Sequence, residues 1–133
     1  MILIDTNVWT DVLVEDVRWR AWSEERVLAA SDRGQAAINP IIYTELTIGF
    51  PSDEALRERV PERSVRYLDL PYEAAFAAGR AFAGYKQRGG AKTSPLPDFY
   101  IGAHARAENL TILTRDARRY QTYFPDVRLI TPD

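Results

Sequence analysis

Residues 1–7 read MILIDTN, so three apolar residues run directly into an aspartate, a threonine and an asparagine. A secretory signal needs a basic start and a longer apolar stretch, so this segment does not match one. Three apolar residues in a row are typical of a short buried strand, which predicts a strand over residues 2–4 with Asp5 at its carboxyl end. An aspartate there either forms a turn or belongs to a functional site, and the remaining segments distinguish these interpretations.

The composition is that of one globular domain. Of the 133 residues, 46% are hydrophobic and 27% are charged, which argues against wholesale disorder and allows a single sizeable core. No apolar run approaches the roughly 20 residues that cross a bilayer, so no membrane partner is expected. Cysteine is absent, which excludes disulfides and thiolate metal sites and agrees with a cytoplasmic location.

The charge pattern leaves nucleic acid open as a partner. A net charge of −2 argues against a histone-like polycation, but a local cluster of acids can hide a basic rim. Every basic residue except Lys86 and Lys92 is an arginine. Arginine suits bidentate contacts to phosphate, although the same bias can reflect genomic composition alone.

The hydrophobic pattern predicts strands that alternate with helices. We expect strands over residues 2–4, 36–39, 65–70, 111–114 and 128–130. We expect helices over residues 6–14, 18–33, 40–49, 51–60, 72–88, 98–108 and 117–123. The segment GGAKTSPLP (89–97) is expected to be a loop because of its glycines and prolines. This order predicts an α/β fold, a single three-layer domain over residues 1–133 with a mainly parallel central sheet of about five short strands flanked by helices.

Four acids from separate segments are predicted to meet at one edge of this sheet. Asp5 and Asp116 follow the first and fourth strands, and sites in such sheets form beyond the carboxyl ends of the strands. A helix that returns to a parallel strand begins at that same edge. Asp98 and Glu45 lie in the first turns of two such helices, so they are expected there as well.

Each acid also has an ordinary structural interpretation. Asp5, Asp98 and Asp116 stand where helix caps stand, and Glu45 fits a solvated helix position. Capping and solvation do not easily explain why all four acids meet at one edge. Four carboxylates without a counterion repel one another, which lowers the stability of the fold. A divalent cation relieves that repulsion. Oxygen ligands, with one histidine and no cysteine in the chain, favour Mg²⁺ or Mn²⁺ over Zn²⁺.

Four segments together resemble the signature segments of PIN-domain ribonucleases, in the same order and spacing. They are MILIDTNVW (1–9), YTELTIGF (43–50), PDFYIGAHA (97–105) and LTRDARRY (113–120). The similarity covers nearly the whole chain and is most marked for VapC-type toxins of toxin–antitoxin pairs. It implies a PIN-like fold, a metal-dependent endoribonuclease that leaves a 5′-phosphate and a 3′-hydroxyl, a cognate antitoxin partner and a homodimer.

The resemblance also assigns roles within the site. Its catalytic acids are Asp5, Glu45, Asp98 and Asp116, with Thr6 and Thr114 as polar neighbours. Asp5 is expected to bind the metal most directly, and Asp98 and Asp116 to bind it or to orient water. Glu45 is a further ligand or the base that holds the attacking water. One or two ions, about 3.5–4 Å apart where there are two, activate water and stabilise charge on the reacting oxygens.

The chain departs from the family pattern in two places. The family has a run of small alanines after the third acid, where this chain has Gly102 and His104, and usually a phenylalanine after the fourth, where it has Tyr120. We expect neither departure to touch the acids. His104 lies six residues after Asp98, which turns it off the face of that acid, so a packing or surface position is expected.

An acidic pocket repels RNA, so phosphates must be bound by basic residues around it. The candidates flank Asp116 or surround the Gly-Gly loop, and they are Lys86, Arg88, Lys92, Arg115, Arg118 and Arg119. An ordinary solvated surface explains the same residues equally well. The loop that leads into Asp98 either orders over the substrate or is a plain connector.

Two apolar features allow more than one interpretation. Trp19 and Trp22 are expected in the core or in a helix contact, and could instead form a patch that receives a partner. The helix over residues 72–88 is rich in small residues and places Ala75, Phe76, Gly79, Phe82 and Ala83 on one face. Such a face allows close helix packing, either within the core or between two subunits.

Three alternatives to an active PIN-domain nuclease make different demands on the sequence. A phosphotransfer protein of the haloacid-dehalogenase type needs a second acid two residues after the first, where this chain has Asn7. A receiver domain needs adjacent acids near the first strand and a lysine after the last strand, and the chain has neither. A catalytically inactive PIN-like binding scaffold is the remaining alternative, although all four acids are in place.

Overall fold

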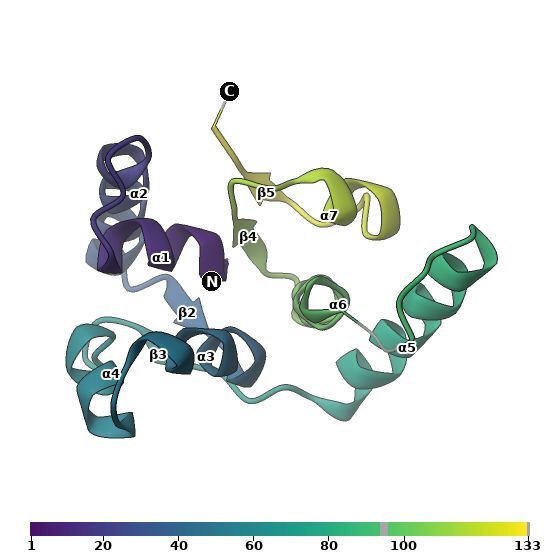
Figure 1. Cartoon of the computed structure of the whole chain (residues 1–133), viewed down its shortest axis with the longest axis horizontal. Coiled ribbons are helices and arrows are strands. Elements are labelled where there is room, and N and C mark those ends of the chain that lie inside the picture. Colours follow the sequence, from purple (N-terminus) through teal and green to yellow (C-terminus); the bar gives the residue numbers. More distant parts are fainter. Residues whose placement is uncertain (94–95, 133) are drawn as a thin grey trace.

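The computed structural model describes residues 1–93 and 96–132, which form a parallel sheet with helices on both sides (Figure 1). The strands are β1 (Ile2–Ile4), β2 (Ala36–Ile38), β3 (Arg66–Tyr67), β4 (Thr111–Leu113) and β5 (Leu129–Ile130). The helices in these ranges are α1 (Thr6–Leu13), α2 (Arg20–Asp32), α3 (Pro40–Leu46), α4 (Asp53–Arg59), α5 (Tyr72–Gln87), α6 (Pro97–Glu108) and α7 (Arg118–Tyr123). A 3₁₀ turn, η1 (Thr47–Gly49), follows α3. The expected α/β fold with a central parallel sheet is confirmed.

The strand order is β3-β2-β1-β4-β5, and every pairing is parallel. In Figure 1, α1, α2 and α4 lie to the left of the sheet, and α5, α6 and α7 lie to its right. The central strands are buried from both sides, and Leu3 and Ile4 are fully inaccessible to solvent. Receiver domains have the strand order 2-1-3-4-5, so the sheet excludes that alternative.

Local hydrogen bonds explain where the structure departs from the expected element ends. Asn39 was expected as the last residue of a strand but caps α3, because its Oδ1 accepts a hydrogen bond from the backbone N–H of Ile42 at 3.0 Å. The helix expected over residues 18–33 begins two residues later. The Asp16 carboxylate fixes the turn before this helix, because it accepts a hydrogen bond from the backbone N–H of Trp19 at 2.8 Å.

The segment expected to be a loop, residues 89–97, connects α5 to α6. Ser94 and Pro95 lie outside the described residues, and Pro97 is already the first residue of α6. Gly90 packs against the ring of Tyr85, and a Cβ on Gly90 would come within 2.2 Å of that ring. A residue without a side chain is therefore required where the chain turns over Tyr85.

Within the described ranges, no helix is both long and apolar enough to cross a bilayer.

Helix α5 buries a different face from the one that the small residues suggested. Ala74 and Ala78 are fully buried where α5 packs on α6. Phe76 is 67% exposed, and Gly79 is exposed beside it. The expected close packing of this helix within the core is thus confirmed, although Phe76 and Gly79 lie outside that contact, and a contact with a second subunit stays a prediction.

Helix α6 passes through the interior, and the first departure from the family pattern, at Gly102 and His104, lies in its packing. His104 is fully buried, with its Nδ1 3.0 Å from Nδ2 of Asn39 and its Nε2 3.4 Å from a carboxylate oxygen of Glu108. The expected packing role of His104 is confirmed, and the surface alternative is wrong. Gly102 faces Phe124, whose ring would lie 2.3 Å from a Cβ at that position.

We predict that Gly102→Ala destabilises the protein although alanine is the better helix former. Helix propensity favours alanine by about 1 kcal/mol, whereas overpacking a closed site costs about 1–3 kcal/mol. Phe124 is 1% exposed and has little room to move, so we expect a net loss of about 1 kcal/mol in the free energy of unfolding. Urea denaturation measures this loss.

The matched control is Gly79→Ala on α5, where no described atom lies within 4 Å of the added methyl group. This variant should be as stable as the parent or more stable. A Gly102→Ala protein that is also more stable than the parent would contradict the packing of α6 against Phe124.

Candidate active site

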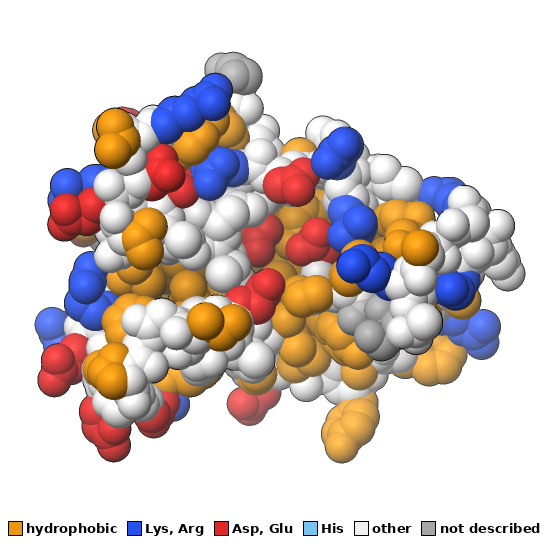
Figure 2. Space-filling view, in the orientation of Figure 1, with side chains coloured by type: hydrophobic (Ala, Val, Ile, Leu, Met, Phe, Trp, Pro, Cys, Tyr) orange, Lys and Arg blue, Asp and Glu red, His pale blue; other side chains and the backbone are white. Residues whose placement is uncertain are grey.

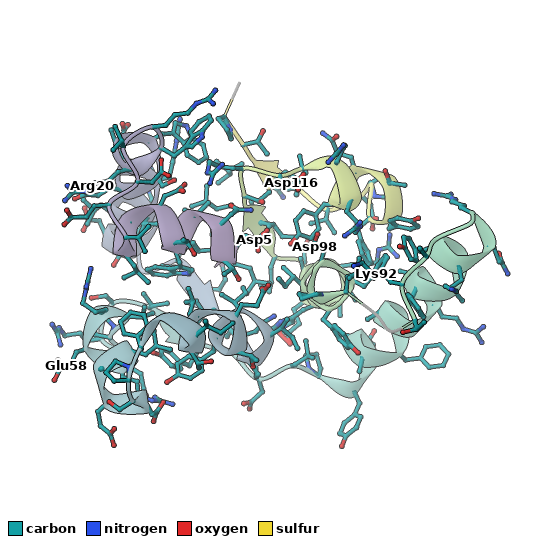
Figure 3. The ribbon with its side chains drawn as sticks, in the orientation of Figure 1. Asp5, Arg20, Glu58, Lys92, Asp98 and Asp116 are labelled. Carbon is teal, nitrogen blue, oxygen red and sulfur yellow. The ribbon has the colours of Figure 1, made fainter. Side chains whose placement is uncertain are left out.

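The four predicted acids line one cavity at the carboxyl edge of the sheet. Its volume is about 270 Å³, and its lining residues are Asp5, Thr6, Asn7, Glu45, Asp98 and Asp116. Figure 3 shows Asp5, Asp98 and Asp116 gathered around the centre of this face from three different segments. Figure 2 shows acidic side chains around the middle of the same face, with Lys and Arg side chains beside them on the side of α5 and α7.

Asp5 is the most firmly held of the four acids. It is 5% exposed, and its Oδ1 accepts a hydrogen bond from the backbone N–H of Thr6 at 2.8 Å. Its Oδ2 accepts two more, from the hydroxyls of Thr114 and Tyr120, both at 2.9 Å. Burial raises the pKa of the Asp5 carboxyl, while these three donors act in the opposite direction because they stabilise the charged form. The orientation of Asp5 is thus fixed by three separate segments.

Thr114 and Asn7 connect the two central strands above the sheet. The Thr114 hydroxyl donates its hydrogen to Asp5, so its oxygen is free to accept from Nδ2 of Asn7 at 3.1 Å and from the N–H of Asp116 at 3.1 Å. Asn7 Oδ1 in turn accepts from the N–H of Arg115 at 3.0 Å. These bonds hold the turn that carries Asp116 against the start of α1.

Glu45 is connected to the same network through Thr6. The Thr6 hydroxyl donates to Oε1 of Glu45 at 2.6 Å, which ties α1 to α3. Glu45 is half-buried rather than solvated, and burial raises the pKa of its carboxyl. The interpretation of Glu45 as an ordinary exposed helix residue therefore fails.

The capping interpretation holds for only one of the three aspartates. Asp5 is the N-cap of α1 and accepts a backbone hydrogen bond there. Asp98 lies within the first turn of α6, whose N-cap is Leu96, and α7 begins after Ala117 with no side-chain cap. Capping therefore does not explain Asp98 or Asp116.

Asp98 carries the clearest sign of crowded negative charge. Burial, together with the charges of Asp5, Glu45 and Asp116, raises its pKa to about 6. Arg119 acts in the opposite direction, with its Nη1 3.5 Å from Oδ2 of Asp98. One guanidinium thus offsets part of the repulsion among the carboxylates.

The donor set fits a hard divalent cation. Its four carboxylates match the oxygen ligands that Mg²⁺ and Mn²⁺ prefer, and a cation would offset the burial and the mutual repulsion that raise the pKa values of Asp5, Glu45 and Asp98. Among residues 1–93 and 96–132, however, no three acids or histidines lie close enough together to form a metal site as they stand. Metal binding therefore requires these carboxylates to draw closer around the ion.

The six predicted RNA-binding residues do not form one rim. Arg118 and Arg119 line a second cavity beside the acids, and Arg88 lies over the ring of Tyr123 at the edge of that cavity. Lys92 is exposed and donates its backbone N–H to the Tyr85 hydroxyl, and Lys86 is exposed in the last turn of α5.

Arg115 has a structural role instead. Its guanidinium forms a two-pronged ion pair with buried Asp11 at 2.6 and 2.8 Å and lies over the ring of Trp19. Asp11 also accepts a hydrogen bond from the hydroxyl of Ser23 at 2.6 Å, so the pair ties the Asp116 turn to α1 and α2. Arg115 is thus held away from the second cavity.

Two residues of the site were missed by sequence reasoning. Tyr120 was expected not to touch the acids, but it is fully buried and donates to Asp5. Burial and the neighbouring Asp5 charge raise the Tyr120 pKa well above its usual value, so its hydroxyl stays protonated as a donor. Asn7 lies two residues after the first acid in the sequence, which was the available signal for its place beside Thr114.

The chain belongs to the PIN domain family, whose family model matches residues 2–125. No protein of curated function matches it significantly.

Solved structures of toxin–antitoxin complexes share the fold. A chain of VapBC2 from Rickettsia felis, bound to a DNA fragment from its promoter, is 20% identical over 100% of both chains, with a TM-score of 0.72. A toxin–antitoxin complex from Klebsiella pneumoniae is 22% identical over 100% of this chain and 98% of the other, with a TM-score of 0.71. FitAcB from Neisseria gonorrhoeae is 26% identical over 98% and 96% of the two chains, with a TM-score of 0.67.

We predict that Asp98→Asn stabilises the metal-free protein, and increasingly so as the pH rises from about 4.5 to 7.5. The folded-state pKa of Asp98, about 6, lies above the ordinary value of 3.8, so its contribution to stability is fully present below 3.8 and is lost as the pH rises through 6. Asparagine does not titrate and avoids this loss. Thermal unfolding in EDTA should show a difference in Tm of a few degrees at pH 7.5 that shrinks toward pH 4.5.

Asp126→Asn is a control with the opposite sign. Its carboxylate accepts a hydrogen bond from Arg106 at 2.8 Å, which lowers its pKa, so the substitution should cost stability above the ordinary pKa of aspartate. A Tm difference for Asp98→Asn that does not change with pH would show that the pKa of Asp98 is not raised in the folded protein.

Proposed function

We propose that the chain is a Mg²⁺- or Mn²⁺-dependent endoribonuclease and the toxin of a toxin–antitoxin pair, acting in the cytoplasm. The observation that carries this proposal is the convergence of four carboxylates from four segments in one cavity. Membership of the PIN domain family supports it. An inactive scaffold would have no need to bury these carboxylates together, and burial with their mutual charges raises the pKa of Asp98 to about 6.

In this proposal Asp5, Asp98 and Asp116 hold the metal and Glu45 acts beside them. The bound ion supplies activation of water and stabilisation of the charge on the attacking and leaving oxygens of the phosphodiester. Asp5 keeps its orientation through Thr114 and Tyr120, which occupy one of its oxygens from the side of the protein.

Glu45 is suited to take the proton of the attacking water. Burial raises the pKa of its carboxyl, which strengthens it as a base. The hydrogen bond from Thr6 fixes one of its oxygens. Glu45 on α3 lines the same cavity as Asp98 on α6.

A protein partner is part of the proposal. The similar structures from Rickettsia felis and Klebsiella pneumoniae are complexes of toxins with antitoxins. Large apolar side chains stand exposed on this chain around α1, α2 and η1, and they are Val14, Val17, Leu28 and Ile48. An antitoxin that covers such residues would bury apolar surface, and a homodimer would cover the exposed Phe76 face of α5.

We predict that the purified, partner-free protein cleaves RNA in Mg²⁺ or Mn²⁺ and not in EDTA. Asp5→Asn should lower the rate at least a hundredfold, because the amide keeps the size of the side chain but removes the charge that holds the ion. Gel analysis of end-labelled RNA measures the cleavage. Asp126→Asn, on the surface away from the cavity, should cleave like the parent.

Cleavage that persists in EDTA or in a folded Asp5→Asn protein would contradict the proposed mechanism. If no RNA is cut, calorimetric titration with Mn²⁺ decides between two causes. Binding of the ion would show that the right RNA is missing, whereas no binding would support the inactive scaffold.

We further predict that induced expression of the chain alone arrests bacterial growth. The Asp5→Asn and Glu45→Gln variants, produced at equal levels, should leave growth unaffected because they keep the fold and lose the chemistry. Optical density and total RNA integrity after induction measure the effect. Equal arrest by parent and variants would show that toxicity does not arise from this cavity.

A further inference from the structure

His104 is a buried polar side chain to which the chemistry proposed above gives no role. It lies on α6, six residues after Asp98, and it is fully inaccessible to solvent. It is not among the residues that line the acidic cavity. A polar ring in the interior lowers stability unless hydrogen bonds satisfy it. The partners of His104 lead to another acid of the cavity, Glu45.

The first partner of the ring is Asn39, the residue that caps α3. Asn39 is 2% exposed, and its Nδ2 lies 3.0 Å from Nδ1 of His104. Its Oδ1 already accepts a hydrogen bond from the backbone N–H of Ile42 at 3.0 Å. The amide therefore turns its NH₂ group toward the ring, so Nδ1 of His104 must be an acceptor that carries no proton.

The second ring nitrogen agrees with this assignment. A neutral imidazole carries one proton, which then lies on Nε2. Nε2 is 3.4 Å from a carboxylate oxygen of Glu108, one turn further along α6. Burial lowers the pKa of His104 below its ordinary value of 6.5, although Glu108 acts in the opposite direction. The ring is thus a neutral acceptor aimed at the cap of α3.

Helix α3 carries Glu45 in its second turn and is only seven residues long. A helix of this length is not stable alone, so its cap and its packing determine where it lies. It packs on both α1 and α6. Its beginning is held to α6 at His104, and its second turn is held to α1 by the hydrogen bond from Thr6 to Glu45 at 2.6 Å. The place of Glu45 relative to Asp98 therefore depends on both attachments.

We infer that His104 is a positioning residue of the active site, which fixes Glu45 relative to Asp98 through the cap of α3. The inference rests on the proposed nuclease function and deepens it. His104 acts by accepting the hydrogen bond that orients Asn39. Without this bond α3 is free to shift on α6, and a displacement of about 1 Å at a catalytic group can lower a rate about a hundredfold.

The first test reads the ring directly and needs no RNA. Because the chain has one histidine, its two ring nitrogens give the only imidazole signals in a ¹⁵N NMR spectrum. We expect Nδ1 to be unprotonated and Nε2 to be protonated in the parent protein at neutral pH. The opposite tautomer, or an imidazolium, would overturn the inference, because the Asn39 amide could then not donate to the ring.

The second test breaks the link and keeps the fold. His104→Leu removes the acceptor and keeps an apolar side chain of similar size, whereas Asn39→Ser keeps a good capping residue and places no donor at the ring. Each should lower kcat about tenfold and change KM and the dissociation constant of Mn²⁺ less than twofold. His104→Asn should restore most of the rate, since its Oδ1 replaces Nδ1 as the acceptor. If His104→Leu fails to fold, an unchanged kcat in Asn39→Ser still contradicts the inference.

Two control variants separate this link from a general loss of stability. Glu108→Gln changes the group beside the other ring nitrogen, and its amide oxygen can still accept from Nε2. Ser52→Ala removes the cap of α4, where the Ser52 hydroxyl accepts from the N–H of Ala55 at 3.1 Å. It should lower Tm by a few degrees. Both controls should keep the kcat of the parent, and a tenfold loss in Ser52→Ala would show that kcat follows stability alone.

A double-mutant cycle determines whether His104 acts through Glu45. In a Glu45→Gln protein, whose slow cleavage is measured at high protein concentration, His104→Leu should change kcat less than twofold. A further tenfold loss would overturn the link to Glu45.

A parent protein that cuts no RNA would count against the nuclease function itself. The backbone amide resonance of Glu45 then decides the link. It should move in Asn39→Ser and not in Glu108→Gln, and a resonance that stays in place in Asn39→Ser would overturn the inference.

Discussion

The parallel pairing of β1 with β4 is the constraint on which the site depends. It places Ile4 opposite Leu113, so the next residues of the two strands, Asp5 and Thr114, leave the sheet side by side. The N–H of Asp5 donates to the carbonyl of Leu113 at 2.9 Å, and the Thr114 hydroxyl donates to the Asp5 carboxylate at 2.9 Å. A slip of one residue in this register would turn every side chain of the strand to the opposite face and separate these partners.

Burying these carboxylates together lowers the stability of the fold, and uncharged hydrogen-bond donors reduce that loss. Asp5 is almost fully buried, and three hydrogen bonds stabilise its charge without adding another charge to the cavity. Asp98 has Arg119 at 3.5 Å, and its pKa still stands at about 6. Functional sites commonly retain such unfavourable interactions because the chemistry requires them. Here the remaining negative charge is what a divalent cation would bind.

Much of the fold and of the acid placement could be predicted from the sequence. The alternation of short apolar runs with helical segments predicted the parallel sheet, and parallel topology then placed the residues after β1 and β4, and those that begin α3 and α6, at one edge. These predictions needed only the chain order and the rule that all strands point in one direction. They did not need the packing of any side chain.

The features that sequence reasoning missed depend on packing. Tyr120 reaches Asp5 only because α7 lies with that side chain turned inward, and Arg115 pairs with Asp11, a residue 104 positions away in the chain. The buried face of α5 was misjudged for the same reason, since both faces of that helix carry small residues. The second cavity combines residues of α5 and α7 with Asp98 of α6, and their proximity follows from how these helices pack together.

The most direct test of the proposed site is anomalous X-ray diffraction from crystals grown with Mn²⁺, at a wavelength where manganese scatters strongly. We expect an anomalous peak among Asp5, Asp98 and Asp116, with Glu45 facing it and the Asp98 carboxylate drawn toward the ion and away from Arg119. The same crystals of Asp5→Asn should lack the peak. A peak elsewhere on the protein, or no peak with the four carboxylates unmoved, would contradict the assignment of this cavity as a metal-dependent active site.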